Sequence, residues 1–258
     1  MIKLKKKEKS EIDLYQIEIL PKRKNKIVAL AGNPNTGKST VFNKLTGLKQ
    51  HTGNWPGKTV TRAEGYFEIE KEEYTLIDLP GTYSLLSTSE DEEIARDFIL
   101  FGNPDATVIV CDASTLERNL NLAFQIMQIT NRCILCVNLI DEAKRKGIEI
   151  DREQLEKDIG IPVVLTNARD GEGINELKEK IYLISKRIIE PKPRKIELRK
   201  EIQEKVNVLK PLLEKNFPGL RCPEWIAIRL LEGDKKIRKA VEHGTLLDLI
   251  NKNSLNGD

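Results

Sequence analysis

A glycine-rich turn joins the first apolar run of this chain, Ile27–Ala31, to an amphipathic segment, Lys38–Leu45. The turn follows the pattern G-x-x-x-x-G-K-[ST], with the residues Gly32, Asn33, Pro34, Asn35, Thr36, Gly37, Lys38 and Ser39. In that pattern the backbone N–H groups of the turn face phosphate oxygens, and the positive end of the following helix faces the same anion. The sequence therefore predicts a strand, a phosphate loop and a helix in that order.

Short apolar runs alternate with longer amphipathic segments over residues 26–190. The runs that predict strands are Ile27–Ala31, Ala63–Ile69, Glu73–Asp78, Thr107–Asp112, Cys133–Leu139 and Pro162–Thr166. The segments that predict helices are Lys38–Leu45, Glu90–Leu100, Leu116–Ile129, Arg152–Ile159 and Ile174–Arg187. Strands separated by helices of this size imply β-α-β crossovers, while a charged turn makes the second and third runs an antiparallel pair. We expect an α/β domain with a mainly parallel six-stranded sheet covered by helices on both faces.

The composition changes at residues 190–193, a stiff basic linker of sequence E-P-K-P. Few β-branched clusters follow it, so we expect a small all-α domain over residues 191–258. Its predicted helices are Lys195–Asn216, Trp225–Leu231, Lys235–His243 and Thr245–Asn251, with Pro211, Pro218, Gly219, Pro223 and Gly244 as breaks or boundaries. Residues 1–25 are Lys-rich and predict either a flexible arm or a weak anchor to an anionic surface.

The bulk composition describes an ordinary soluble protein, with 39% apolar and 32% charged residues. A formal net charge of +3 gives no strong indication of nucleic-acid binding. No run approaches the ~18 apolar residues that cross a bilayer, and the N-terminus lacks the apolar core of a signal peptide. Cys133 and Cys136 form a C-x-x-C within a predicted strand, where residues three apart point to opposite faces. We therefore expect a soluble chain in which these two cysteines are core residues rather than metal ligands.

A second phosphate-site motif, D-x-x-G, follows a predicted strand and consists of Asp78, Leu79, Pro80 and Gly81. Asp78 is placed to hold Mg²⁺ through water, and the Gly81 N–H to meet a γ-phosphate. In the phosphate loop, Lys38 reaches the β- and γ-phosphates and the Ser39 hydroxyl ligates Mg²⁺, with Thr40 beside it. Together the motifs predict a site for a nucleoside triphosphate and Mg²⁺.

Two further loops predict the base that is bound. Asp141 can accept hydrogen bonds from N1–H and N2–H₂ of guanine, which adenine cannot donate, and Asn138 would tie this loop to the phosphate loop. After the next strand come Asn167, Ala168 and Arg169, where the backbone N–H of Ala168 could contact guanine O6. A strand end followed by a helix cap would also explain Asp141, but the set of motifs favours guanine.

The order of these motifs resembles that of the Ras-like GTPases. More narrowly, the chain resembles the cytoplasmic N-terminal part of the ferrous-iron transport protein B family, over residues 26–250. The narrower resemblance rests on residues 32–35 (G-N-P-N), 53–59 (G-N-W-P-G-K-T) and 78–85 (D-L-P-G-T-Y-S-L), and on the trailing helical domain. The G-N-W-P-G segment is its specific part, because general GTPases share the other motifs.

The resemblance implies that residues 48–62 form a first switch and residues 78–92 a second. Gly57, Lys58 and Thr59 would join the nucleotide site, with Thr59 closing on Mg²⁺ and the γ-phosphate in the GTP state. Release of both switches after hydrolysis is the order-to-disorder event that such proteins use. The implied catalytic residues are Asn35, Lys38, Thr59 and Gly81.

The resemblance also implies how GTP would be hydrolysed. Thr82 stands where Ras has a glutamine that orients the attacking water. Relatives with an asparagine at the position of Asn35 use K⁺ beside the phosphates, held partly by first-switch carbonyls, here those of Gly53 and Trp55. Slow hydrolysis accelerated by K⁺ is therefore expected, the ion supplying the charge that an arginine finger supplies elsewhere. The alternative is that Asn35 only forms a turn after Pro34.

Two residues depart from the common pattern, because Leu139 replaces a lysine and Asn167 replaces a serine. In the family, membrane helices follow the helical domain and carry the metal path. The resemblance thus implies a GTP- and GDP-binding module at the cytoplasmic face of a membrane, with a membrane transport domain as partner and the oligomeric state open. The chain is then either part of a longer protein or a stand-alone homologue.

Two other functions stay open. A ribosome- or RNA-associated GTPase would need a KH-type G-x-x-G loop, and the glycines after residue 190 are not spaced that way, so no nucleic-acid partner is expected. A GTP-responsive interaction protein with little turnover is the other alternative, given Thr82 and Asn167.

Overall fold

The computed structural model describes residues 25–55, 59–86, 89–244 and 246. In this part of the chain a seven-stranded sheet has the order β2-β3-β4-β1-β5-β6-β7, and it is parallel except for the pairs β2·β3 and β3·β4. The strands are β1 (Lys26–Gly32), β2 (Gln50–Asn54), β3 (Thr61–Ile69), β4 (Glu72–Asp78), β5 (Ala106–Asp112), β6 (Cys133–Asn138) and β7 (Val163–Leu165). The central strands are continuous apolar runs because helices cover both of their faces.

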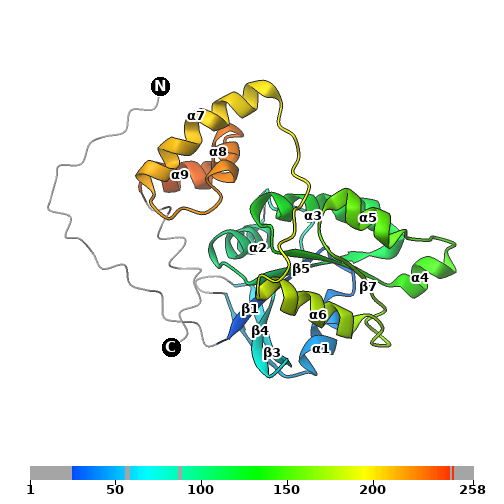
Figure 1. Cartoon of the computed structure of the whole chain (residues 1–258). Coiled ribbons are helices and arrows are strands. Elements are labelled where there is room, and N and C mark those ends of the chain that lie inside the picture. The colour runs from blue at the N-terminus through cyan, green and yellow to red at the C-terminus, as the bar shows by residue number, and fades with distance from the viewer. Residues whose placement is uncertain (1–24, 56–58, 87–88, 245, 247–258) are drawn as a thin grey trace.

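Helices lie on both sides of this sheet (Figure 1). They are α1 (Lys38–Thr46), α2 (Glu90–Phe101), α3 (Leu116–Ile129), α4 (Ile140–Arg145), α5 (Arg152–Ile159) and α6 (Ile174–Ser185), with a short 3₁₀ turn, η1 (Ala113–Thr115), before α3. Val28 and Leu30 of β1 face a core shared with α1 and α6, whereas Ala29 faces a core shared with α2 and α3. The two-residue period of a strand therefore assigns each side chain of β1 to one of two cores.

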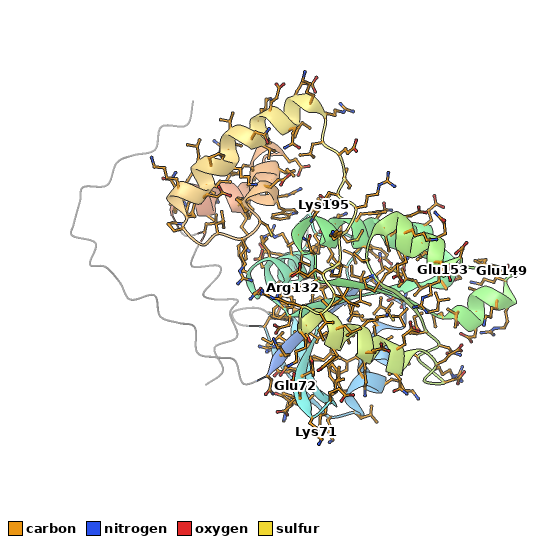
Figure 2. All side chains as sticks on the ribbon, viewed as in Figure 1. Lys71, Glu72, Arg132, Glu149, Glu153 and Lys195 are labelled. Carbon is orange, nitrogen blue, oxygen red and sulfur yellow. The ribbon has the colours of Figure 1, made fainter. Side chains whose placement is uncertain are left out.

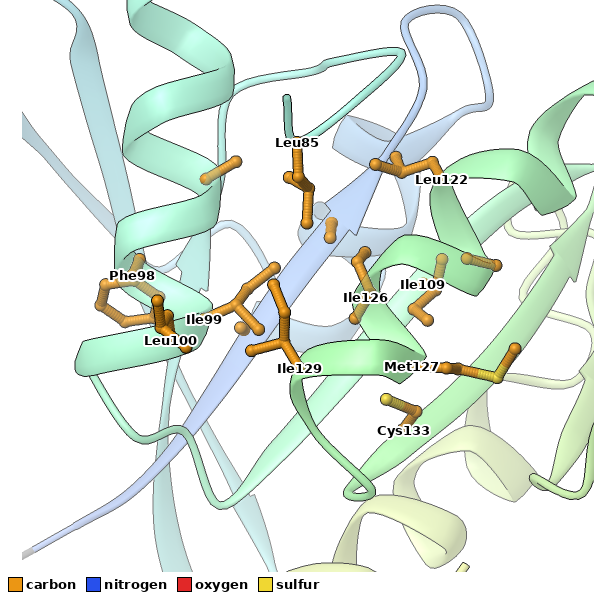
Figure 3. Close-up of a cluster of buried hydrophobic side chains, with 14 of the residues drawn as sticks. Leu85, Phe98, Ile99, Leu100, Ile109, Leu122, Ile126, Met127, Ile129 and Cys133 are labelled. Carbon is orange, nitrogen blue, oxygen red and sulfur yellow. The ribbon is translucent and has the colours of Figure 1, made fainter. Parts of the chain in front are cut away.

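The core between the sheet, α2 and α3 is drawn in Figure 3. Phe98 and Ile99 of α2, Ile126 of α3 and Ile109 of β5 all belong to it, and all four are at most 3% exposed. Leu85, which belongs to the predicted second switch, is 2% exposed in the same core. Burial of each such side chain contributes about 1.5–3 kcal/mol.

Three helices, α7 (Lys200–Asn216), α8 (Pro223–Leu231) and α9 (Lys235–Glu242), form a separate layer beside α2 and α3 (Figure 1). Trp225 and Ile226 of α8 are buried in a cluster continuous with the core over α2 and α3. The linker is held to the sheet domain by two backbone hydrogen bonds, from Lys192 N to Gly160 O (3.0 Å) and from Arg194 N to Ile159 O (2.8 Å). The helical layer therefore packs on the sheet domain instead of hanging from a free linker.

The structure corrects some details of the expected elements. The sheet has seven strands rather than six because the polar segment Gln50–Asn54 pairs with β3 as an edge strand. The short helix α4 was also missed. In the helical domain, α7 begins at Lys200 rather than Lys195, and Pro211 lies inside it instead of breaking it. Pro211 is exposed, so the backbone carbonyl that loses its helical partner there can be hydrated.

Cys133 and Cys136 lie on opposite faces of β6, in the two different cores, as the sequence predicts. Burial raises the pKa of each thiol to about 12, and their positions on opposite faces of the strand keep the two thiols from sharing one metal ion. Among the described residues, no group of three or more His, Cys, Asp and Glu side chains is arranged to hold a metal ion. No helix in the described ranges is both long and apolar enough to span a bilayer.

Gly65 allows β3 to pack closely on α1. A Cβ at Gly65 would lie 2.5 Å from Thr46 Cγ2 and 2.9 Å from Phe42 Cζ. We expect Gly65→Ala to lower the free energy of unfolding by about 1–3 kcal/mol, because a well-packed core must shift to admit the methyl group. The measurement is urea unfolding.

Gly53 on the neighbouring strand β2 is a matched control, because a Cβ there meets nothing within 4 Å. We expect Gly53→Ala to change the unfolding free energy by less than about 0.5 kcal/mol. Equal effects of the two variants would contradict the predicted close packing of β3 on α1.

Candidate functional site

The phosphate loop connects the end of β1 to the start of α1, and close approaches fix its glycines. A Cβ at Gly32 would lie 2.6 Å from Val110 O, and one at Gly37 would lie 2.3 Å from Asn138 Nδ2. Gly37 has φ 78° and Asn35 has φ 65°, both in the left-handed region that glycine and asparagine tolerate best. The close contacts require glycine at positions 32 and 37, and the left-handed conformation at positions 35 and 37 favours asparagine and glycine.

The D-x-x-G segment runs alongside this loop at the end of β4. The ammonium of Lys38 donates to Asp78 Oδ1 and to Leu79 O, the latter at 2.7 Å. Thr82 N donates to Gly32 O (3.3 Å), and a Cβ at Gly81 would be 3.6 Å from Pro34. The two motifs thus meet at the carboxyl edge of adjacent parallel strands, where ligands of open α/β sheets bind.

The residues present fit a Mg²⁺ site. Burial raises the pKa of the Asp78 carboxyl, and the positive charge of Lys38 opposes that rise. Ser39 presents its hydroxyl in the first turn of α1 and is exposed. A carboxylate and a hydroxyl beside a phosphate loop are hard oxygen ligands of the kind that Mg²⁺ prefers.

The third predicted Mg²⁺ ligand lies elsewhere. The Thr59 hydroxyl hydrogen-bonds to Glu90 Oε2 (3.4 Å) at the start of α2, and this contact is exposed. The structure therefore brings Ser39 and Asp78 together with Lys38 but directs Thr59 toward the second switch. Gly57 and Lys58 lie outside the described residues.

Asn138 is the residue that joins the three loops of the site. Its Nδ2 donates to Thr36 O in the phosphate loop (3.0 Å). Its Oδ1 accepts from Thr166 Oγ1 (3.1 Å) and from Ala168 N (3.0 Å). All four residues are at most 1% exposed, so these bonds are shielded from water. The Ala168 N–H, which the sequence assigns to guanine O6, is used here by the Asn138 side chain.

The predicted base-binding residues lie in the two loops that Asn138 connects to the phosphate loop. Asp141 lies in the first turn of α4 and accepts from the Arg145 guanidinium (3.2 Å) across an exposed surface. Leu139 has φ 62°, and its Cδ2 would be 3.7 Å from a Cβ at Gly37, so it packs on the phosphate loop. The Asn167 amide donates to Asp170 (2.7 Å) and closes the turn that carries Ala168 and Arg169.

The residues predicted to hold K⁺ have the following surroundings in this structure. Gly53 is paired with Arg62 in the β2·β3 ladder. The Trp55 indole is 5% exposed and packs edge-on against Phe98 of α2, with ring centroids 5.5 Å apart. Asn35 is exposed in the phosphate loop.

Sequence reasoning missed how firmly the second switch is anchored. Gln125 of α3 accepts hydrogen bonds at Oε1 from Leu85 N (2.7 Å) and Ser84 Oγ (3.3 Å). The Arg118 guanidinium lies 4.9 Å from the centroid of the Tyr83 ring. The leucine in P-G-T-Y-S-L was a signal for the buried anchor, but nothing local indicated Gln125 or Arg118.

An ionic cluster joins α2, which follows the second switch, to the helical domain. Arg96 of α2 is fully buried and contacts Asp97 (2.7 Å) and Asp234 (3.4 Å). Lys236 of α9 bonds Asp97 (2.9 Å) and Glu93 (2.7 Å) from the other side. Asp234 also caps α9, accepting at Oδ1 from the backbone of Lys236 and of the residue after it. Breaking a buried ion pair such as Arg96–Asp234 costs about 3–5 kcal/mol. This pair therefore holds α2 against the helical domain.

Comparison with known proteins places most of the chain in one family. Residues 26–181 match a family model described as "Ferrous iron transport protein B", and residues 199–255 match one described as "FeoB cytosolic helical domain". The Fe(2+) transporters FeoB of Salmonella typhimurium and Escherichia coli (strain K12) are each 38% identical to it over 211 and 213 residues. Each alignment covers 80% of this chain and 27% of the relative, so the chain spans about a quarter of their length.

Solved structures agree with the sequence matches. The cytosolic domain of the T. maritima FeoB iron transporter in GDP form I is 37% identical, with a TM-score of 0.77 over 89% of this chain and 94% of that chain. The cytosolic domain of L. pneumophila FeoB is 34% identical, with a TM-score of 0.76 over 89% and 90%. The α/β domain followed by a small helical domain is therefore the architecture of these proteins.

Removing the Asn138 side chain tests whether it holds the three loops together. We expect Asn138→Ala to lower the free energy of unfolding by about 2–4 kcal/mol, because Thr36 O and Ala168 N would be left buried without a partner. Asn121→Ala is the control, since Asn121 is exposed and its side chain donates to Arg118 O (3.3 Å) across that exposed surface. A cost for Asn138→Ala no larger than for the control, measured by urea unfolding, would contradict this role.

Proposed function

The chain belongs to the ferrous iron transport protein B family, and on that premise we propose that it is a GTP-binding, slowly GTP-hydrolysing module that regulates ferrous-iron transport. The observation that carries the proposal is the Asn138 side chain, which ties the guanine-type loop to the phosphate loop within the buried edge of the sheet. The T. maritima cytosolic domain, which has the same fold, has been solved in a GDP form.

The nucleotide is proposed to lie along the carboxyl edge of the sheet. Its proposed contacts are Gly32, Asn33, Pro34, Asn35, Thr36, Gly37, Lys38, Ser39, Thr40, Gly57, Lys58, Thr59, Asp78, Leu79, Pro80, Gly81, Asn138, Asp141, Asn167, Ala168 and Arg169. Lys38 would exchange its bonds to Asp78 and Leu79 for phosphate oxygens, with the N-terminus of α1 behind it. Because the Ala168 N–H is bonded to Asn138, base selection would rest mainly on the Asp141 carboxylate.

Mg²⁺ would be held by Ser39 and Asp78, with Thr59 joining in the GTP state. When bound, the ion neutralises phosphate charge. For Thr59 to join, its hydroxyl must leave Glu90, so the first switch would move away from the start of α2. That exchange supplies a two-state element of the kind that nucleotide switches use.

The helical domain is proposed to sense the switches through α2. Trp55 of the first switch packs on Phe98, and Leu85 of the second switch is buried beside the same helix. At its other side α2 carries Arg96, which contacts Asp234 of the helical domain. A rearrangement of either switch would therefore reach the helical domain through one rigid helix, and through it the transport domain of the family.

The RNA-associated alternative loses its support. It required a nucleic-acid-binding unit after residue 190, whereas residues 199–255 match the family's helical domain. The low-turnover alternative stays open, because Thr82 is 4% exposed and its N–H is bonded to Gly32 O. A turnover measurement separates it from the GTPase.

Replacing Asp141 by asparagine tests the guanine assignment. We expect Asp141→Asn to weaken GDP binding about 100-fold, because two charge-assisted hydrogen bonds to guanine are lost. Xanthosine diphosphate, which has a carbonyl in place of the 2-amino group, should gain affinity for the variant. Fluorescent GDP, ADP and xanthosine diphosphate analogues would be titrated into each protein, with Glu149→Gln, an exposed carboxylate on the following loop, as the control. Unchanged GDP affinity in Asp141→Asn, or a preference of the parent for ADP, would refute the guanine site.

Two substitutions at Asn35 separate a K⁺ ligand from a turn-former. Phosphate release from GTP should be at least about tenfold faster in KCl than in NaCl at equal ionic strength, because a positioned cation stabilises developing charge. Asn35→Gly keeps the left-handed turn but removes the amide oxygen, so it should lose K⁺ stimulation as fully as Asn35→Ala does. Stimulation retained in Asn35→Gly would leave Asn35 as a turn-former only. Equal rates in the two salts would remove K⁺ from the mechanism.

A further inference from the structure

A cleft of about 660 Å³ lies between the sheet domain and the helical domain, away from the phosphate loop. Its walls come from the end of α3, the loop before β6, the linker, and parts of α7 and α8. Figure 2 labels Arg132 and Lys195, which lie on the side of the sheet domain that faces the helical layer. Neither residue has a part in the proposed nucleotide site.

The charge of this cleft is strongly one-sided. Its lining carries one carboxylate, Glu224, against five cationic side chains, which are Arg132, Arg187, Lys195, Lys210 and Arg221. Within the described ranges, no carboxylate forms an ion pair with Arg132, Arg187, Lys195 or Lys210. Arg132 donates to the Asn103 amide oxygen, and Lys195 donates to the Met127 carbonyl. The acceptors that these two cations find are therefore neutral.

Burial makes this arrangement costly. Burial lowers the pKa of the Arg132 guanidinium; the negative charge of Asp105 opposes this fall, and the positive charge of Arg187 adds to it. The pKa of Lys195 is also lowered by burial. Groups held in this way favour any bound species that restores negative charge beside them.

Donor groups without acceptors complete the lining. Gln128 Nε2 is buried and has no hydrogen-bond partner among the described residues. The N-terminus of α8 also opens here, where Cys222 (φ 51°) gives no side-chain cap and Pro223 begins the helix. Its first-turn N–H groups and dipole add positive potential to that of the cations. The cleft thus offers N–H donors and positive charge, which is the chemistry of an anion site.

We propose that this cleft binds a phosphate-bearing anion, supplied either by a free phosphorylated compound or by the headgroup of an anionic lipid. Guanidinium groups match phosphate oxygens with paired N–H donors, and a cleft of this volume is in the range of small-molecule sites. Arg132 and Arg187 belong to the sheet domain, Lys195 to the linker, and Lys210 to the helical domain. A bound anion would therefore hold the helical domain against the sheet domain independently of the nucleotide.

The first test titrates inorganic pyrophosphate into the full chain by calorimetry at low salt. Lys38→Ala is included in every protein, so that binding at the phosphate loop does not contribute. Arg187→Gln combined with Lys210→Gln should weaken pyrophosphate binding about tenfold or more, since two charge-assisted contacts are removed. The control pair is Lys144→Gln with Lys215→Gln, which removes two exposed charges elsewhere and should leave the affinity unchanged within about twofold. Thermal unfolding of each variant would establish that it is folded.

The second test distinguishes the two sources of phosphate. Sedimentation with phosphatidylglycerol vesicles, with phosphatidylcholine vesicles as reference, is compared for the same variants. If the Arg187→Gln, Lys210→Gln protein loses vesicle binding but keeps pyrophosphate binding, the ligand is a lipid headgroup. If it loses pyrophosphate binding but keeps vesicle binding, the ligand is a free anion. The proposal is overturned if neither binding depends on this pair more than on the control pair. The proposal is also overturned if the unmodified chain binds pyrophosphate and the Lys38→Ala chain does not, because that binding belongs to the phosphate loop.

Discussion

The buried amide of Asn138 fixes the arrangement on which the rest of the site depends. Parallel strands bring their carboxyl ends to one edge, so the loops after β1, β6 and β7 necessarily approach one another. Approach alone does not set their positions, and the side chain of Asn138 does so with one donor and one acceptor. Because its partners are as buried as it is, any other arrangement leaves polar groups without hydrogen bonds. Gly37 makes these hydrogen bonds possible, since a side chain there would occupy the place of the Asn138 amide.

The connection from the site to the helical domain uses two kinds of contact on one helix. At α2 the switches are attached through apolar surface, by Trp55 on Phe98 and by Leu85 in the adjacent core. The helical domain is attached to α2 through charge, by Arg96 with Asp234 and Lys236 with Asp97. Apolar contacts can slide at modest cost, whereas a buried ion pair must stay matched or be broken at high cost. A moving switch would thus tilt α2 while its charged residues stay in register with the helical domain.

The local parts of this fold were predictable from sequence because local chemistry sets them. The bounds of α3 and α5 were predicted as observed, since Asp151 caps α5 and Gly160 ends it in the left-handed region. The family and the order of the phosphate and guanine motifs followed from short segments as well. The strand Gln50–Asn54 was missed because it is polar, and its structure comes from pairing with β3 rather than from its own residues. Contacts between distant segments were beyond the reach of sequence patterns. Arg96 reads as a solvated charge on an amphipathic helix, and only the packing of α8 and α9 over α2 makes it a buried one.

Two groups of charges lie between the sheet domain and the helical domain, and the difference between them is informative. Around Arg96 the cations are paired across the domain boundary, since Arg96 of α2 contacts Asp234 and Lys236 of α9 contacts Asp97 and Glu93. Holding the two domains together is enough to explain this cluster. The cleft near Arg132 has the same place in the architecture, but its lining carries five cations and a single carboxylate, Glu224. Like charges gathered in this way repel one another and weaken the contact between the domains. A purely structural interface would gain by losing them, so the cationic cleft is better explained by an anion that completes it than by the stability of the folded chain.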